Sequence, residues 1–192
     1  LVPLMILEAP VLAGVSYLCN RWVRDEHTFL WSDFKDAVKE NWKQAIALQA
    51  FSMVIYGLSF ISARIYLLYA ESQWFMTIGV GVLMLVILVL GMMNNFMIPM
   101  CVRYRMNVRT IIRNSFLLSI VRLPSAAAIT LGLALPILLF FFFPQFLYIA
   151  GMWYLLIGFG FKHFLRGYFA QKVFEKYMKP EGEEVEALEA DA

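Results

Sequence analysis

Charged residues are scarce in this chain. They make up 16% of the 192 residues, whereas hydrophobic types make up 61%. A soluble domain carries about a quarter charged residues and about half apolar residues. So much apolar surface cannot be hidden in one small core, so we expect much of it to face lipid. A net charge of +2 is also too small to indicate nucleic acid as a partner.

Residues that carry chemistry are scarce as well. The chain has two cysteines, Cys19 and Cys101, and two histidines, His27 and His163. It contains no HExxH, no GxSxG, no paired cysteines and no glycine-rich phosphate loop. We therefore expect neither an enzyme nor a cofactor or metal site. The cysteines adjoin basic segments that we expect in the cytoplasm, where thiols stay reduced, so no disulfide is predicted. We interpret His163 as a membrane-interface residue, with a proton carrier or ligand as the alternative.

Long uncharged runs are present instead. Residues 44–63, 72–102 and 123–161 contain no charge, and residues 1–20 contain only Glu8. A helix needs about 20 apolar residues to cross the hydrocarbon core. The run at 123–161 is too long for one span and is broken at Pro144. The sequence thus predicts an all-α, polytopic helical membrane protein in one domain, 1–178. Its five transmembrane helices are expected at about 1–20, 45–63, 74–100, 125–143 and 146–161.

Basic residues set the expected orientation. Of the sixteen Lys and Arg, fifteen lie in residues 20–43, 101–123 and after 161, and Arg64 is the exception. Lys and Arg accumulate in cytoplasmic loops. We therefore predict a multi-pass protein of the plasma membrane with its C-terminus in the cytoplasm. Residues 179–192 carry six Glu or Asp and almost no large apolar residue, so an acidic, disordered tail is expected there.

Two cytoplasmic segments have the spacing of amphipathic helices, at about 30–44 and 107–122. In the first, Leu30, Phe34, Val38 and Trp42 form an apolar stripe beside three lysines and three acids. Such helices lie in the membrane interface. The mixed charges also suit docking against a protein, with a mere connector between spans as the alternative. The candidate docking residues are Lys35, Lys39, Trp42, Lys43, Arg109 and Arg113.

Few polar residues fall inside the expected spans. The candidates are Glu8, Asn94 and Asn95. Glu8 is either a helix-end residue near water or a contact for a substrate or cation, since a mid-bilayer acid costs about 3 kcal/mol. The two asparagines serve either helix packing or a ligand or hinge site.

Four stretches resemble the YesL-like family of Gram-positive membrane proteins, whose function is unknown. They lie at 9–26, at 34 with 41–45, at 98–115 and at 172–177, and the resemblance covers most of residues 9–178. It implies a helical membrane protein encoded beside carbohydrate ABC importers, and it implies no activity. The glycine that the family often has near Arg24 is Asp25 in this chain.

Two functions remain open at this stage. The expected one is an accessory or scaffolding subunit that contacts membrane lipid and the permease subunits of a carbohydrate ABC importer. The expected cytoplasmic side is large, whereas the outer links are short. The alternative is a small-solute-binding transport subunit, similar to the binding component of vitamin importers. That reading needs polar groups that converge within the bilayer, and Gln49 and Ser52 could add to Glu8, Asn94 and Asn95.

Overall fold

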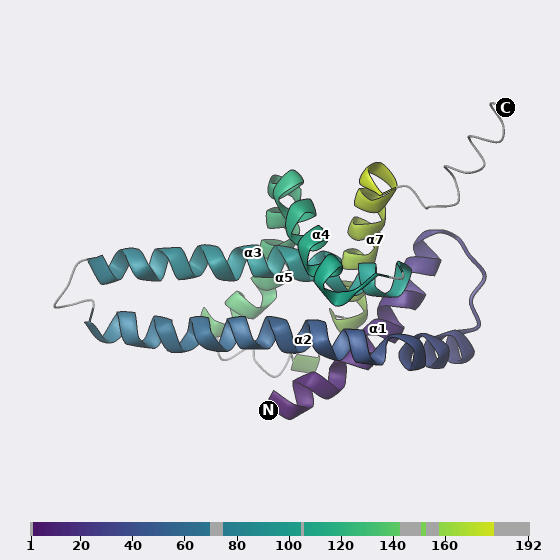
Figure 1. Ribbon diagram of the computed structural model, residues 1–192, viewed down its shortest axis with the longest axis horizontal. Helices are drawn as coiled ribbons and strands as arrows, with labels where there is room; N and C mark the ends of the chain where they lie inside the picture. Colours follow the sequence, from purple (N-terminus) through teal and green to yellow (C-terminus); the bar gives the residue numbers. More distant parts are fainter. Residues whose placement is uncertain (1, 70–74, 105, 143–150, 153–157, 179–192) are drawn as a thin grey trace.

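The described part of the chain is helical. The computed structural model describes residues 2–69, 75–104, 106–142, 151–152 and 158–178, and no strand occurs among them. The helices are α1 (Val2–Val23), α2 (Leu30–Tyr69), α3 (Phe75–Arg103), α4 (Val108–Val121), α5 (Leu123–Phe142) and α7 (Phe159–Tyr177), arranged as in Figure 1. The expected all-α class is confirmed.

Helices α2 and α3 form a long hairpin. Its free end projects beyond the other helices, which gather around its opposite half (Figure 1). The 40 residues of α2 correspond to about 60 Å, twice the thickness of the hydrocarbon core. The sequence analysis treated 30–44 and 45–63 as separate elements, and the structure joins them in one helix. No proline occurs between residues 30 and 69, so nothing breaks the helix at residue 45.

Fewer of the described helices could span a membrane than the sequence predicted. Two of them, α2 and α3, are long and apolar enough to cross a membrane. The pair α4 and α5 adds a third span if these two helices, bent by 101°, are counted together. Five spans were predicted, so the described residues support two or three. The expected span at 1–20 coincides with α1, and most of the expected span at 146–161 lies outside the described residues, as does the acidic segment 179–192.

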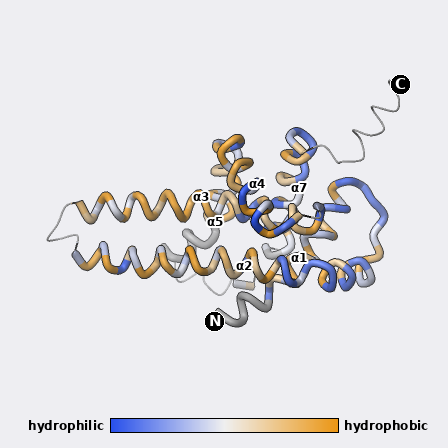
Figure 2. The backbone as a smooth tube through the Cα atoms, viewed as in Figure 1, coloured by the Kyte–Doolittle hydropathy of each residue, from blue (hydrophilic) through white to orange (hydrophobic). Residues whose placement is uncertain are grey.

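The free end of the hairpin consists largely of hydrophobic residues (Figure 2), and many of their side chains are exposed. They include Val54, Leu58, Phe60, Ile61, Ile65 and Leu68 of α2 and Phe75, Ile78, Val82, Met84 and Leu85 of α3. Soluble monomers rarely expose an apolar surface of this extent. The free end of the hairpin therefore has the surface of a membrane-embedded segment.

The core lies where the second half of α3 meets α4 and α7. Phe96 is fully buried, and its ring lies 5.4 Å from Phe169 and 6.3 Å from Phe174, measured between centroids. Tyr104 meets Phe174 edge-on at 5.6 Å. These spacings are those of favourable aromatic pairs. The last helix is thus held against α3 by a cluster of rings.

Helix α1 packs on the first half of α2 through small residues. Ala9, Ala13 and Ala45 are fully buried between the two helices. A Cβ atom at Gly14 would lie 2.6 Å from the Phe34 ring and 2.8 Å from a methyl of Val38. Phe34 and Val38, two residues of the apolar stripe predicted at 30–44, therefore pack against α1 within the molecule.

The turn between α1 and α2 is held by charges. Arg21 pairs with Glu26 at 3.0 Å and with Asp33 at 2.9 Å, and Arg24 pairs with Glu26 at 3.0 Å. Asp33 also accepts a hydrogen bond from the backbone N–H of Phe29. Arg21 thus links the end of α1 to the first turn of α2.

Candidate functional site

A polar cavity of about 470 Å³ lies among five helices. This volume is within the range of about 300–1,000 Å³ that is typical of small-molecule sites. The polar residues that line it are Glu8 and Ser16 of α1; Gln49, Ser52 and Tyr56 of α2; Asn94 of α3; Thr130 of α5; and Lys162, His163 and Arg166 of α7. The cavity thus joins polar side chains from segments that are far apart in the sequence.

One wall of the cavity consists of neutral amide and hydroxyl groups. Ser52 donates a hydrogen bond to Oδ1 of Asn94 at 2.9 Å, and Nδ2 of Asn94 donates to the Tyr56 hydroxyl at 3.3 Å. These bonds cross from α2 to α3. They hold the Asn94 amide between two hydroxyl groups, where donors and acceptors alternate. We call Ser52, Tyr56 and Asn94 the neutral wall.

The adjacent asparagine has a different position. Asn95 is fully buried, and its Nδ2 donates to the Thr130 hydroxyl of α5 at 2.8 Å. Neighbouring residues of a helix point about 100° apart, so Asn94 and Asn95 face different partners. The structure therefore places Asn94 on the cavity and Asn95 in the contact between α3 and α5.

A second part of the cavity lining is charged. Lys162, His163 and Arg166 of α7 meet Glu8 of α1 at the cavity. Burial lowers the pKa of Lys162 to about 8; Arg166 acts in the same direction and Glu8 against it. Burial lowers the pKa of His163 to about 3, so this imidazole is neutral at pH 7. Two cations and one carboxylate leave this wall with one net positive charge. We call these four residues the charged wall.

Helix α3 shapes the cavity through Pro99. Proline lacks the N–H that would bond to the carbonyl four residues earlier, so it loosens the helix there. The Pro99 carbonyl accepts a hydrogen bond from Nδ2 of Asn20 at 3.4 Å, which links α1 to this part of α3. About two turns further back, Thr130 approaches Gly91 so closely that a Cβ there would lie 2.8 Å from the Thr130 methyl group.

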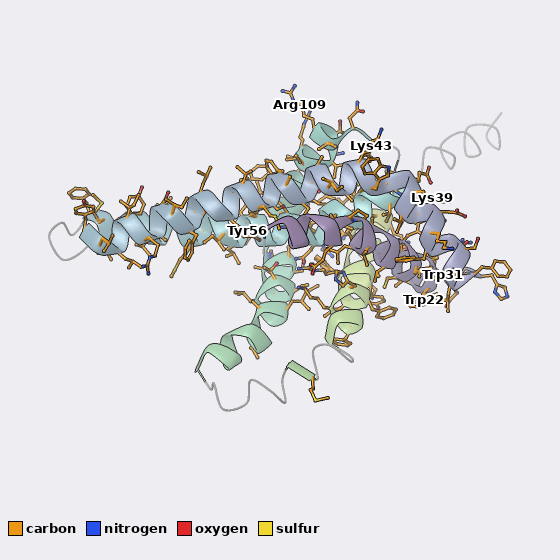
Figure 3. The ribbon with its side chains drawn as sticks, turned by 90° about the horizontal axis from the view of Figure 1, so that it is seen from below. Trp22, Trp31, Lys39, Lys43, Tyr56 and Arg109 are labelled. Atoms are coloured by element: carbon orange, nitrogen blue, oxygen red, sulfur yellow. The ribbon has the colours of Figure 1, made fainter. Side chains whose placement is uncertain are left out.

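The predicted docking residues lie elsewhere. Lys35, Lys39, Trp42 and Lys43 are exposed on the first half of α2, and Arg109 and Arg113 are exposed on α4. Figure 3 shows Lys39, Lys43 and Arg109 toward the outside of the molecule. The Lys35 ammonium lies 4.8 Å from the Trp31 ring centroid and that of Lys43 lies 5.4 Å from the Trp42 ring centroid. None of the six lines the cavity.

Sequence reasoning identified part of the cavity. Glu8 and Asn94 were candidates, Gln49 and Ser52 were named with them, and all four line it. Lys162 and Arg166 were assigned to the cytoplasmic tail. A usable signal was present: Lys162 and Arg166 follow a long uncharged run and share one helix face at spacing i, i+4, with His163 next to Lys162 in the sequence.

A second cavity of about 390 Å³ lies where α2 meets the end of α3, with Asn41, Gln44 and Asn107 among its lining residues. Among the described residues, no group of His, Cys, Asp and Glu could hold a metal ion. The described cysteines, Cys19 and Cys101, are buried and free.

Comparison with known proteins gives one match. Residues 3–63 match the model of a family described as "Protein of unknown function, DUF624". The match covers α1, the turn and most of α2, and it includes the cavity residues Glu8, Gln49, Ser52 and Tyr56. No curated protein and no solved structure matches the chain.

Proposed function

We propose that this protein binds a small polar solute in the cavity among α1, α2, α3, α5 and α7, as a solute-binding membrane subunit. The observation that carries the proposal is the convergence of a neutral wall and a charged wall on one cavity of about 470 Å³. From the sequence, this function was the alternative prediction, since it requires polar groups that converge within the bilayer.

The energetics support a binding role. Ionisable groups in or beside membrane spans are costly, and they generally mark substrate or ion pathways. Stability alone would favour apolar packing between the helices, since buried ion pairs are often replaceable by apolar residues without loss. A cavity lined by ten polar side chains from five helices is instead suited to binding a small polar ligand.

Ligand-dependent stabilisation of the purified protein tests the proposal. A ligand at about 100 times its Kd stabilises the folded state by about 2.7 kcal/mol. A panel of neutral sugars, polyols, amino acids and small organic acids is therefore screened by thermal unfolding in detergent. Any ligand found is tested again on Asn94→Ala, with Asn114→Ala as the matched control on α4, away from the cavity.

Loss of stabilisation in Asn94→Ala with its retention in Asn114→Ala supports the proposal. If no panel member stabilises the wild-type protein, or if both variants respond like wild type, the cavity is not the binding site.

A second candidate is the accessory subunit of a carbohydrate ABC importer, within a YesL-like family that the DUF624 match is consistent with. The specific observation is an exposed aromatic and cationic surface at the start of α2. Phe29, Leu30 and Trp31 are 79%, 57% and 69% exposed, and the Lys35 ammonium lies 4.8 Å from the Trp31 ring centroid. Exposed aromatic side chains are typical of protein interfaces.

Charge reversal tests this candidate. Changing Lys35, Lys39 and Lys43 to Glu should leave insertion and folding intact, because all three side chains are exposed. If permease subunits dock on this surface, their yield on co-purification drops. Retention of the permease at wild-type yield would show that this half of α2 only connects the turn to the span.

A further inference from the structure

We infer that the solute of this cavity is a small hydroxylated carboxylate, with its carboxylate facing Lys162 and Arg166 and its hydroxyl groups facing the neutral wall. This inference rests on the proposed function and adds the chemical class of the ligand. It follows from how charge and neutral polar groups are distributed around the cavity.

The charged wall determines the sign of the charge that the ligand carries. Lys162 and Arg166 come from one face of α7, and Glu8 of α1 is the one carboxylate among the residues that line the cavity. Arg166 stays ionised at any accessible pH. His163 is only 8% exposed, and a neutral imidazole there adds a hydrogen-bonding group without charge. The net charge of the wall is thus matched by a monoanion.

A carboxylate fits this charge better than a phosphate. A phosphate monoester carries about −1.5 to −2 charges at pH 7, which exceeds what the charged wall neutralises. The guanidinium of an arginine matches the two oxygens of a carboxylate with two parallel hydrogen bonds. Lys162 adds a second, more adaptable donor on the same helix face.

The neutral wall selects the remainder of the ligand. Ser52 and Tyr56 carry hydroxyls, and the Asn94 amide between them carries both donor and acceptor atoms. Groups that donate and accept at once pair well with alcohol hydroxyls, which do the same. A purely apolar acid would desolvate this wall without using its remaining donor and acceptor capacity, which opposes binding.

Matched pairs of probes test the ligand class. Gluconate is compared with sorbitol, and glucuronate with glucose, because each pair differs only in a carboxylate that replaces a CH₂OH group. Binding to the purified protein in detergent is measured by calorimetry and by thermal unfolding. We expect the two acids to bind at least about tenfold more tightly than their neutral partners, because the acid gains charged hydrogen bonds.

Variants on α7 locate the carboxylate. Arg166→Gln should weaken binding of the acids at least about tenfold, while Lys172→Gln, further along the same helix and exposed, should not. Arg166→Lys keeps the charge and guards against a folding defect in Arg166→Gln; it should bind with intermediate affinity because it loses the two-pronged geometry.

The pH dependence supplies a separate readout. Affinity for gluconate should fall several-fold as pH rises from about 7 to about 9, since Lys162 loses its proton near pH 8 and gluconate stays ionised. Lys162→Met should abolish this dependence.

The outcomes distinguish the proposed binding function from the proposed class of ligand. Equal binding of acid and neutral partner, unchanged in Arg166→Gln, overturns the carboxylate assignment and leaves the cavity as a site for a neutral solute. If no solute of the wider panel binds to the folded protein, the proposed function fails, and the ligand class fails with it.

Discussion

At Asp25 the backbone adopts φ 54°, the one positive φ of a non-glycine residue in the described part of the chain. The N–H of Asp25 bonds to the Trp22 carbonyl and that of Glu26 to the Arg21 carbonyl. This pair of bonds is the Schellman ending of a helix, whose left-handed residue is usually glycine. Glycine would adopt this turn without strain, whereas Asp25 adopts it at a cost.

Asp25→Gly should stabilise the protein by about 0.5–1 kcal/mol, because glycine adopts a positive φ without strain. Thermal unfolding in detergent measures the change. Asp36→Gly is the matched control, since Asp36 is exposed within α2 and glycine there should destabilise the helix by about 0.5 kcal/mol. Destabilisation by both variants would contradict this account of the turn.

His163 makes the stability depend on pH. Burial lowers its pKa from 6.5 to about 3, and Arg166 and Lys162 act in the same direction. Acidification below pH 6.5 therefore protonates this histidine in the unfolded state and not in the folded state. Protonation stabilises the unfolded state, so folding stability is lost as the pH falls from 6.5 toward 3.

We expect wild-type protein to lose roughly 2 kcal/mol of stability between about pH 7.5 and about pH 5 through this group. His163→Gln should flatten the curve over this interval, whereas His27→Gln should not, since His27 is exposed in the turn between α1 and α2. Melting temperatures across the pH range measure the effect. An unchanged slope in His163→Gln would mean that other groups cause the acid sensitivity.

At the scale of elements, the contact between α1 and α2 depends on small residues. Without a side chain at Gly14, the Phe34 ring and Val38 lie directly against the backbone of α1. Close packing of small residues is the usual basis of helix association in membranes. The amphipathic pattern at 30–44 therefore reflects, in part, packing against α1.

Gly14→Ala should destabilise the protein by about 1–2 kcal/mol, because the added methyl overpacks this contact by more than the gain in helix propensity. Gly57→Ala is the matched control, since nothing lies within 4 Å of a Cβ there. Unfolding of both variants in detergent compares them. Equal stability of the two would show that α1 moves away from α2 at no cost.

Helix α2 illustrates how one element can carry two surfaces. Its first half exposes lysines and packs Phe34 on α1, whereas its second half exposes apolar residues such as Leu58 and Ile65. Figure 2 shows the corresponding change from hydrophilic to hydrophobic residues along the helix. Local pattern predicted a charged, amphipathic first half and an apolar second half. It could not show that they belong to one continuous helix, because a change from amphipathic to apolar composition does not by itself end a helix.

For the whole molecule, the distribution of the basic residues predicts orientation. A cysteine in place of Gln73, in the link between α2 and α3, should be labelled from outside intact cells by an impermeant thiol reagent. A cysteine in place of Asn107, beside the basic start of α4, should not be. Cys19 and Cys101 are buried and are replaced by alanine in both variants, which removes background labelling. The reverse pattern of labelling would overturn the predicted orientation.

The helical membrane class needed only local information. The apolar composition of each uncharged run suits contact with lipid without help from the rest of the chain. Each backbone hydrogen bond of a helix also closes within four residues. Composition and run length were therefore sufficient for the all-α class and for two helices, α2 and α3, that are long and apolar enough to cross a membrane. The expected number of five spans depended on residues at both ends of the chain, which the described helices support only in part.

The cavity required the tertiary structure. Glu8, Asn94 and Lys162 lie in three different segments, and no local pattern says that they face one another. Their meeting depends on how α1 and α7 pack against α3, through buried residues such as Ala13 and Phe174. The sequence alone determined which side chains are polar within an apolar chain, because hydropathy is a property of each residue. Packing decided which of them share a cavity, because contact between distant segments depends on the shapes of all the helices together.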